Sequence, residues 1–124
     1  VLLRVSGPFH SPLLNTAGEK LAEVLAPCKL SGLKIPYISN TLAEPVTDKT
    51  KIKDLLARQI SSPVRWRESM EELIREGVGT FIEIGPGKTL SGFLKKIDRN
   101  AVVYSIQTME DLEKTVELLK GRNL

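Results

Sequence analysis

The only histidine of the chain, His10, stands in a short segment rich in glycine and proline, residues 6–12, with the sequence SGPFHSP. A bend framed by glycine and proline presents a side chain instead of burying it. Imidazole takes up and returns a proton near neutral pH, so a presented histidine is a candidate general base. The segment alone does not identify a group for this base to activate.

The sequence GPGKT at residues 85–89 looks like a phosphate-binding loop, but its spacing excludes one. That motif needs a glycine five positions before Gly87, where this chain has Ile82. What remains is a glycine turn that opens a helix, whose backbone amides either bind an anion or hold a neighbouring loop.

The single cysteine, Cys28, allows no internal disulfide, and we expect it to be a small, at least half-buried residue rather than a nucleophile.

Polar residues near the predicted strand and helix ends admit two interpretations each. Asn40 follows a short strand and either lines a site or caps the turn. Arg65 and Arg67 either pair with nearby glutamates and loops or bind an anion. The lysines at residues 49–53 form either a solvated helix face or a docking surface.

Composition places the chain among ordinary globular proteins. Its 124 residues are 41% hydrophobic and 27% charged, with a formal net charge of +3, and this length can bury a core. With only 5% aromatic residues, we expect no nucleic-acid-binding surface. No run approaches the ~20 apolar residues of a membrane span, and no signal-peptide layout is present. We therefore expect a cytoplasmic protein that does not associate with a membrane. Because the chain opens within an apolar stretch and without methionine, we also expect a fragment.

The hydrophobic periodicity predicts strands that alternate with helices. Strands are expected over residues 1–5, 35–39, 80–84 and 101–106. Helices are expected over residues 12–26, from Asp48 to residue 60, from an N-cap at Ser62 and Pro63 to Gly77, from near Lys88, and from a cap at Thr108. Strands separated by helices favour parallel crossovers, so we expect an α/β fold with mainly parallel strands and flanking helices.

Three stretches taken together resemble one enzyme family: residues 6–13 (SGPFHSPL), 58–66 (RQISSPVRW) and 81–92 (FIEIGPGKTLSG). In this order, and at similar separations, they look like malonyl-CoA:acyl carrier protein transacylases and the acyltransferase domains of fatty-acid and polyketide synthases. The resemblance covers nearly the whole chain. It implies a single C-terminal portion of the acyltransferase fold, with residues 1–6 as the last strand leaving the smaller, ferredoxin-like subdomain, which is otherwise essentially absent. Residues 7–124 would then belong to the α/β-hydrolase-like large subdomain.

The resemblance implies a ping-pong acyl transfer in fatty-acid biosynthesis. A malonyl group moves from coenzyme A to an active-site serine, and then to the phosphopantetheine thiol of acyl carrier protein. By resemblance, His10 takes the serine proton and returns it to the leaving thiol, and the main-chain carbonyl of Gln59 orients the imidazole. Phe9 matches a position that favours malonyl over an α-methyl extender, since a bulky ring fills the space of the methyl group; a packing role is the alternative. We expect no cofactor besides malonyl-CoA as substrate, and a monomeric full-length enzyme.

The rest of the family's machinery has no match in this chain. The family's nucleophile lies in a Gly-His-Ser-Leu-Gly elbow, and no Gly-x-Ser-x-Gly occurs here. The oxyanion donors and the arginine for the malonyl carboxylate also belong to the N-terminal part, so we expect the 124 residues alone to be inactive. The alternatives are a piece of a multifunctional synthase, a hydrolase of the same fold, or a non-catalytic α/β interaction module. Because the carrier protein is acidic in this family, its expected contacts are the lysines at residues 49–53, 88 and 95–96.

Overall fold

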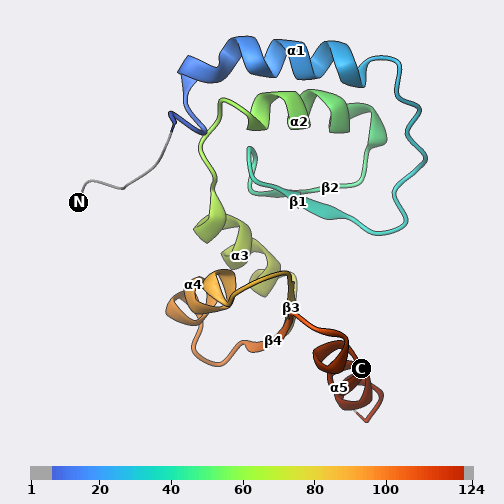
Figure 1. Ribbon diagram of the computed structural model, residues 1–124, viewed down its shortest axis with the longest axis vertical. Helices are drawn as coiled ribbons and strands as arrows, with labels where there is room; N and C mark the ends of the chain where they lie inside the picture. Colours follow the sequence, from blue (N-terminus) through green and yellow to red (C-terminus); the bar gives the residue numbers. More distant parts are fainter. Residues whose placement is uncertain (1–6, 122–124) are drawn as a thin grey trace. The chain divides into compact units, whose positions relative to one another are not determined.

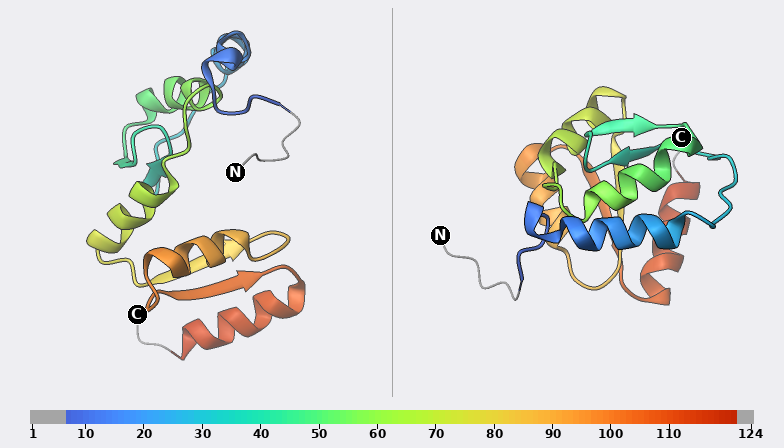
Figure 2. Two further views of the ribbon diagram at one scale, coloured as in Figure 1. Left: turned by 90° about the vertical axis from the view of Figure 1, so that its left-hand side faces the viewer. Right: turned by 90° about the horizontal axis from the view of Figure 1, so that it is seen from above.

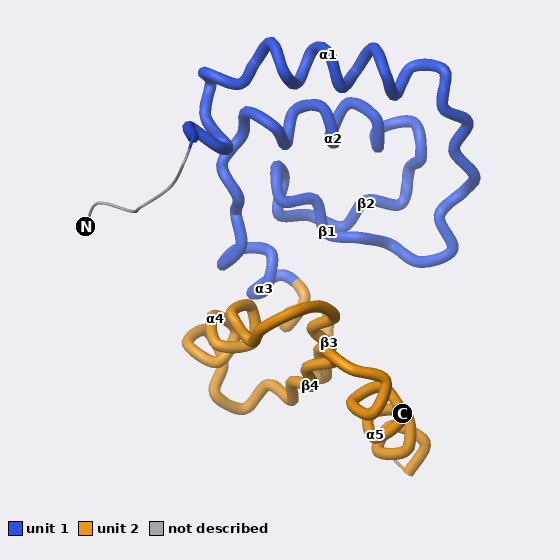
Figure 3. The backbone as a smooth tube through the Cα atoms, viewed as in Figure 1, with its two compact units in different colours: residues 1–72 blue, residues 73–124 orange. Residues whose placement is uncertain are grey.

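The computed structural model describes residues 7–121, so the strand expected over residues 1–5 lies outside the described residues. The chain divides into two compact units, residues 1–72 and residues 73–124 (Figure 3). The boundary between the units falls within helix α3 (Trp66–Arg75). Each unit contains its own helices and its own pair of strands.

Two helices that lie side by side form the scaffold of the first unit (Figure 1). A 3-10 turn, η1 (Pro12–Leu14), leads into α1 (Asn15–Leu25), and a second one, η2 (Lys49–Lys51), leads into α2 (Ile52–Gln59). Both helices lie where the sequence predicts them. Asp48 caps η2 and so starts the helical segment that continues into α2, because its carboxylate accepts the backbone N–H of Thr50 at 2.8 Å.

Helices α1 and α2 approach each other closely at Gly18. A Cβ atom at this buried glycine would lie 2.9 Å from the carbonyl oxygen of Ala57 in α2. At the start of α2, Lys53 Nζ donates to the carbonyl oxygen of Ala26, just past the end of α1, at 2.7 Å. Lys53 therefore satisfies a carbonyl that the helix end leaves open, rather than extending into solvent.

A short antiparallel hairpin completes the first unit. Strand β1 (Tyr37–Ser39) pairs with β2 (Glu44–Val46), a strand that the sequence analysis did not predict. A connection this short joins antiparallel neighbours, because a parallel return needs a crossover of a dozen or more residues. The turn between the strands, residues 40–43, ends at Ala43, which is buried with a φ of 55°.

The second unit is a strand–helix–strand–helix sequence. Strand β3 (Thr80–Ile84) and strand β4 (Val102–Ile106) pair in parallel, in register along their whole length, and α4 (Thr89–Ile97) connects them. Helix α4 and the following helix α5 (Met109–Lys120) lie on opposite sides of this pair (Figures 1 and 2). The predicted α/β fold with parallel strands is thereby confirmed.

The ends of the helices show which local signals are reliable. Thr108 caps α5 as predicted, because its hydroxyl accepts the N–H of Asp111 at 3.2 Å and the Asp111 carboxylate accepts the N–H of Thr108 at 3.0 Å. Helix α3 does not begin at Ser62 and Pro63 as expected but at Trp66. The reason is that the N–H of Arg65, still outside the helix, donates to the carbonyl of Asn40 at 3.2 Å and holds this segment against the β1–β2 turn.

Two further observations concern general properties of the described chain. Within residues 7–121, no helix combines the length and the apolar character that crossing a bilayer requires. Cys28 is exposed rather than half-buried, and its thiol lies 3.5 Å from the carbonyl of Val24 in the last turn of α1.

Replacing Gly18 with alanine tests the close approach of the two helices. The new methyl group would meet a backbone oxygen at 2.9 Å, so one helix has to move. We expect Gly18→Ala to lower the free energy of unfolding by about 1–3 kcal/mol, as measured by denaturant titration.

The matched control for this experiment is Gly92→Ala. Gly92 is also a helical glycine, in α4, but nothing lies within 4 Å of the position that a Cβ atom would occupy there. The same substitution should stabilise the chain at this site by about 0.5–1 kcal/mol, because alanine loses less conformational freedom in a helix. Equal effects of the two substitutions would contradict a helix contact at Gly18.

Candidate active site

The segment around His10 forms a tight bend that ends at the start of η1. His10 is exposed and has a φ of 55°, in the left-handed region that histidine enters more readily than most residues. The Ser11 hydroxyl donates to the carbonyl of Pro8 at 2.7 Å and closes the bend. Next to the imidazole, the ring of Phe9 lies over Gly7 and remains 65% exposed. The bend therefore presents the His10 side chain, as the sequence predicts, and within the described residues Phe9 is exposed as well.

The imidazole of His10 contacts Gln59, a residue 49 positions further along the chain. Nδ1 of His10 lies 3.0 Å from the backbone carbonyl oxygen of Gln59, the last residue of α2. Because a carbonyl only accepts, this contact assigns a proton to Nδ1, and in the neutral imidazole Nε2 is then the acceptor. The structure thus brings together the two residues that the sequence analysis selected as base and orienting group.

The side chain of Gln59 is held by two groups. Thr41, in the β1–β2 turn, donates its hydroxyl to Oε1 at 3.3 Å. Nε2 donates to the carbonyl of Ser62 at 3.5 Å. It also lies 3.4 Å from His10 Nδ1, but this is no hydrogen bond when Nδ1 carries the proton that it donates to the Gln59 backbone at 3.0 Å. The same carboxamide and Asn40 line a small pocket of about 230 Å³ beside β1. Asn40 borders this pocket, and its backbone carbonyl accepts the N–H of Arg65 at 3.2 Å. Its role in a site stays a prediction.

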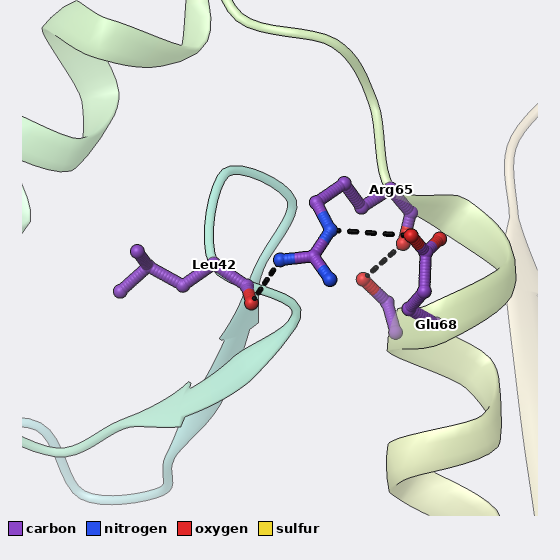
Figure 4. Close-up of polar contacts among 4 residues, drawn as sticks. Leu42, Arg65 and Glu68 are labelled. Carbon is purple, nitrogen blue, oxygen red and sulfur yellow. Dashed lines mark hydrogen bonds and ion pairs between the residues drawn. The ribbon is translucent and has the colours of Figure 1, made fainter.

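Arg65 connects the β1–β2 turn to the start of α3 (Figure 4). Its Nη1 donates to the carbonyl of Leu42 at 2.8 Å, while its Nε donates to the carboxylate of Glu68 at 3.2 Å. The buried Ser69 hydroxyl donates to the Arg65 carbonyl at 2.7 Å. Arg67 in turn pairs with Glu71 at 2.8 Å. Both arginines are thus ion-pair and loop partners, which is the first of the two interpretations from the sequence.

The glycine turn at residues 85–88 is closed by the protein's own side chains. Glu83 accepts the N–H groups of Leu90 and Ser91 at 3.1 and 2.9 Å, and also the Ser91 hydroxyl. The N–H of Gly87 donates to Gln107 Oε1 at 2.7 Å. The helix start therefore holds a neighbouring segment instead of an external anion, which decides between the two uses expected of it.

The hydrogen bonds to Glu83 also set its ionisation. The Ser91 hydroxyl, the Ser91 amide and, less strongly, the Leu90 amide hold the pKa of the Glu83 carboxyl below its ordinary value of 4.5. The sequence analysis did not select Glu83, Gln107 or Thr41. A signal existed only for Glu83, a carboxylate one residue before the end of a strand that turns directly into a helix start, where acidic groups are favoured.

The lysines expected to contact a carrier protein differ in the contacts that their side chains make within the chain. Lys95 Nζ donates to the carbonyls of Arg99 and Ala101 at 3.2 and 2.7 Å, so this residue clamps the turn after α4. Lys96 lies 5.7 Å from the centre of the Phe93 ring. Lys88 precedes α4 and is exposed. Within residues 7–121, no cluster of three or more histidine, cysteine or acidic side chains is arranged to hold a metal ion.

Several known proteins similar to this chain are malonyl transacylases. The malonyl CoA-acyl carrier protein transacylase of Bacillus subtilis is 49% identical over 121 residues, which is 98% of this chain and 38% of that protein. The crystal structure of MCAT from Streptococcus pneumoniae matches with a TM-score of 0.86 and 45% identity, over 94% of this chain and 38% of that one. A malonyl transacylase solved in complex with its type II polyketide acyl carrier protein matches with a TM-score of 0.87 and 33% identity, over the same shares of the two chains. No family model matches the chain.

These matches identify the fold as that of the acyltransferases. The chain is homologous to the C-terminal portion of the malonyl-CoA:acyl carrier protein transacylases, which confirms the resemblance seen in the three sequence stretches. It spans 36–38% of the length of the curated relatives that it matches.

The carboxylate of Glu83 gives the stability of the chain a dependence on acidic pH. Its pKa is lower in the folded chain, so its contribution is complete above the ordinary pKa of 4.5 and is lost as the pH falls through the folded-state value. We expect Glu83→Gln to lower the denaturation midpoint at pH 7 and to flatten the loss of stability between pH 5 and pH 3. Glu113→Gln, on the exposed side of α5, should change neither. Parallel pH curves for both variants and the parent chain would refute the capping role.

Proposed function

We propose that this chain is the C-terminal portion of a malonyl-CoA:acyl carrier protein transacylase, in which His10 is the general base. The observation that carries the proposal is the contact of 3.0 Å between His10 Nδ1 and the backbone carbonyl of Gln59. It orients an exposed imidazole and keeps Nε2 free to accept a proton. The nucleophile, a serine, would come from another part of the protein, because the chain contains no Gly-x-Ser-x-Gly elbow.

In the proposed first half-reaction, Nε2 of His10 accepts the proton of the serine hydroxyl while the serine oxygen attacks the thioester carbonyl of malonyl-CoA. The carbon–sulfur bond breaks, and the imidazolium returns the proton to the leaving coenzyme A thiolate. In the second half, the phosphopantetheine thiol of the carrier protein gives its proton to Nε2 and attacks the seryl ester, and the serine oxygen regains the proton. A thiolate is expelled more easily than an amine, so a neutral carbonyl suffices behind the imidazole.

The surface of the chain supports a role as part of a larger protein. Large apolar side chains are widely exposed within the described residues, among them Leu13 at 80%, Ile35 at 76% and Ile84 at 79%. Conversely, Tyr37 Oη and Trp66 Nε1 are buried, and no hydrogen-bond partner for them is found within residues 7–121. Exposed apolar patches mark surfaces that another structure covers. This supports the proposal that the chain is part of a longer protein, as it spans only 38% of the length of its Bacillus subtilis relative.

Phe9 is the proposed selectivity residue of the acyl group. It directly precedes His10, and its ring is 65% exposed, so the ring is available to a substrate that approaches the imidazole. A phenyl ring there would occupy the space of an α-methyl substituent and favour malonyl over its methylated analogue. A steric difference of one methyl group discriminates by roughly 10–200-fold.

Substitutions at the two site residues test the proposed chemistry in the full-length enzyme that carries this sequence. His10→Ala removes the base, and we expect malonyl transfer to carrier protein to fall by about 10²–10⁴-fold with the fold intact. Gln59→Ala keeps the carbonyl that His10 contacts, so its transfer rate should stay within about tenfold of the parent. The measurement is malonyl transfer from coenzyme A to carrier protein, with thioester hydrolysis followed in parallel.

The outcomes separate the proposed function from its alternatives. Unchanged transfer in His10→Ala would refute His10 as the general base. Absence of transfer in the parent protein as well would favour a non-catalytic module. Hydrolysis without transfer to carrier protein would instead assign a hydrolase.

The proposed macromolecular partner is acyl carrier protein, the partner in one of the matching structures. Among the lysines expected at this contact, Lys53 and Lys95 donate to backbone carbonyls, so their charge reversal would disturb the fold. Lys88 is exposed at the start of α4 and is the better probe. A positive charge there would attract an acidic carrier over a Debye length of about 10 Å at 0.1 M salt.

Charge reversal at Lys88 tests this docking surface. We expect Lys88→Glu to raise the KM for carrier protein by about 3–10-fold at low salt and less at high salt, with the KM for malonyl-CoA unchanged. Lys20→Glu, on the exposed side of α1, is the matched control and should leave both constants unchanged. Equal KM values for the two variants would place the docking surface elsewhere.

A further inference from the structure

The carbonyl of Gln59 is free to contact His10 because of the residue four positions later. In a continuing α-helix, the carbonyl of residue 59 would accept the N–H of residue 63. That residue is Pro63, which has no backbone N–H. The next possible donor, the N–H of Ser62, is directed to the carbonyl of Arg58 at 3.0 Å. The Gln59 carbonyl is therefore left over at the end of α2, where His10 Nδ1 reaches it at 3.0 Å.

We propose that Pro63 is a positioning residue for the imidazole of His10. By withholding the one N–H that helix geometry would direct to the Gln59 carbonyl, it reserves this acceptor for Nδ1. The Nδ1–H tautomer is maintained as a consequence, and Nε2 remains the basic nitrogen. The effect on catalysis rests on the proposed function, whereas the effect on the imidazole does not.

The structure assigns Pro63 no packing role that would explain it otherwise. Its side chain is exposed within the described chain. It also does not open a helix, because α3 begins only at Trp66. The segment is fixed by other groups, since the Arg65 N–H donates to Asn40 and the Gln59 side chain lies 3.5 Å from the Ser62 carbonyl. Replacing the proline should therefore add an N–H without removing the contacts that hold the segment.

The chain offers a matched control for this substitution. Pro27 is also exposed and also follows the end of a helix, α1, but lies at the end of that helix away from the His10 bend. It stands four residues after Glu23, whose carbonyl already accepts the N–H of Ala26 at 3.3 Å. Pro63→Ala and Pro27→Ala thus add the same N–H group and free the unfolded chain equally, but only the first affects the acceptor of His10.

The direct readout is the imidazole itself. Because His10 is the only histidine in the chain, its ring nitrogens are assigned without ambiguity in a ¹⁵N spectrum of the 124-residue protein. We expect Pro63→Ala to shift the Nδ1 resonance toward the other tautomer. The new amide of residue 63 should be protected from hydrogen exchange relative to an unstructured amide. Pro27→Ala should leave the imidazole resonances unchanged. A spectrum of Pro63→Ala that equals the parent spectrum overturns the proposal.

The catalytic readout is malonyl transfer by the full-length enzyme. We expect Pro63→Ala to lower kcat by about 10–100-fold with the KM for malonyl-CoA unchanged, and Pro27→Ala to retain the parent values. A changed imidazole with unchanged transfer would support the role of Pro63 and refute the proposed function. Loss of transfer in His10→Ala, together with full activity in Pro63→Ala, would refute the role of Pro63 alone.

The control for folding is the thermal unfolding midpoint of both proline variants. A second variant at the same position, Pro63→Gly, supplies the same N–H. Loss of the folded state in both variants at residue 63, but not in Pro27→Ala, would overturn the proposal, because Pro63 would then have a structural role.

Discussion

The contact between His10 Nδ1 and the Gln59 carbonyl depends on how closely two helices approach each other. The two groups are 49 residues apart, and the packing of α1 against α2 brings them together. Gly18 permits this packing, since any side chain there would meet the carbonyl of Ala57. Lys53 fastens the opposite ends of the same helices through the carbonyl of Ala26. The imidazole and its acceptor are thereby positioned by backbone geometry rather than by a dedicated side-chain pair.

Directional hydrogen bonds, more than apolar packing, fix the surroundings of this contact. Few apolar side chains of the described chain are buried, and those of the first unit are Ala43, Val46, Leu55 and Met70. The β1–β2 turn compensates for this, because Thr41 holds the Gln59 carboxamide and the carbonyls of Asn40 and Leu42 hold Arg65. A turn of four residues therefore supports both the end of α2 and the approach to α3. Hydrogen bonds of this kind define angles as well as distances, which loose apolar contacts do not.

Local signals in the sequence predict most of this architecture, and the errors occur where a distant partner decides. The bend at His10, the limits of β3 and the capping box at Thr108 follow from neighbouring residues, and all three are observed. The start of α3 is misplaced because a carbonyl 25 residues earlier claims the N–H of Arg65. Strand β2 is missed because three residues that include a proline carry no alternating pattern. For Gln59, the residues alone indicate only a surface or packing role, and the resemblance to the transacylases supplies its link to His10.

A backbone acceptor behind the imidazole has a physical consequence that a side-chain acceptor would not have. The carbonyl at the end of α2 belongs to the last turn, where carbonyl groups lack helix partners and carry the negative end of the helix dipole. It is therefore a strong acceptor without bearing a full charge. Because every residue has a carbonyl, no side-chain type at position 59 specifies this function. What specifies it is the set of neighbouring N–H groups, which is why the informative residue in the sequence is the proline that lacks one.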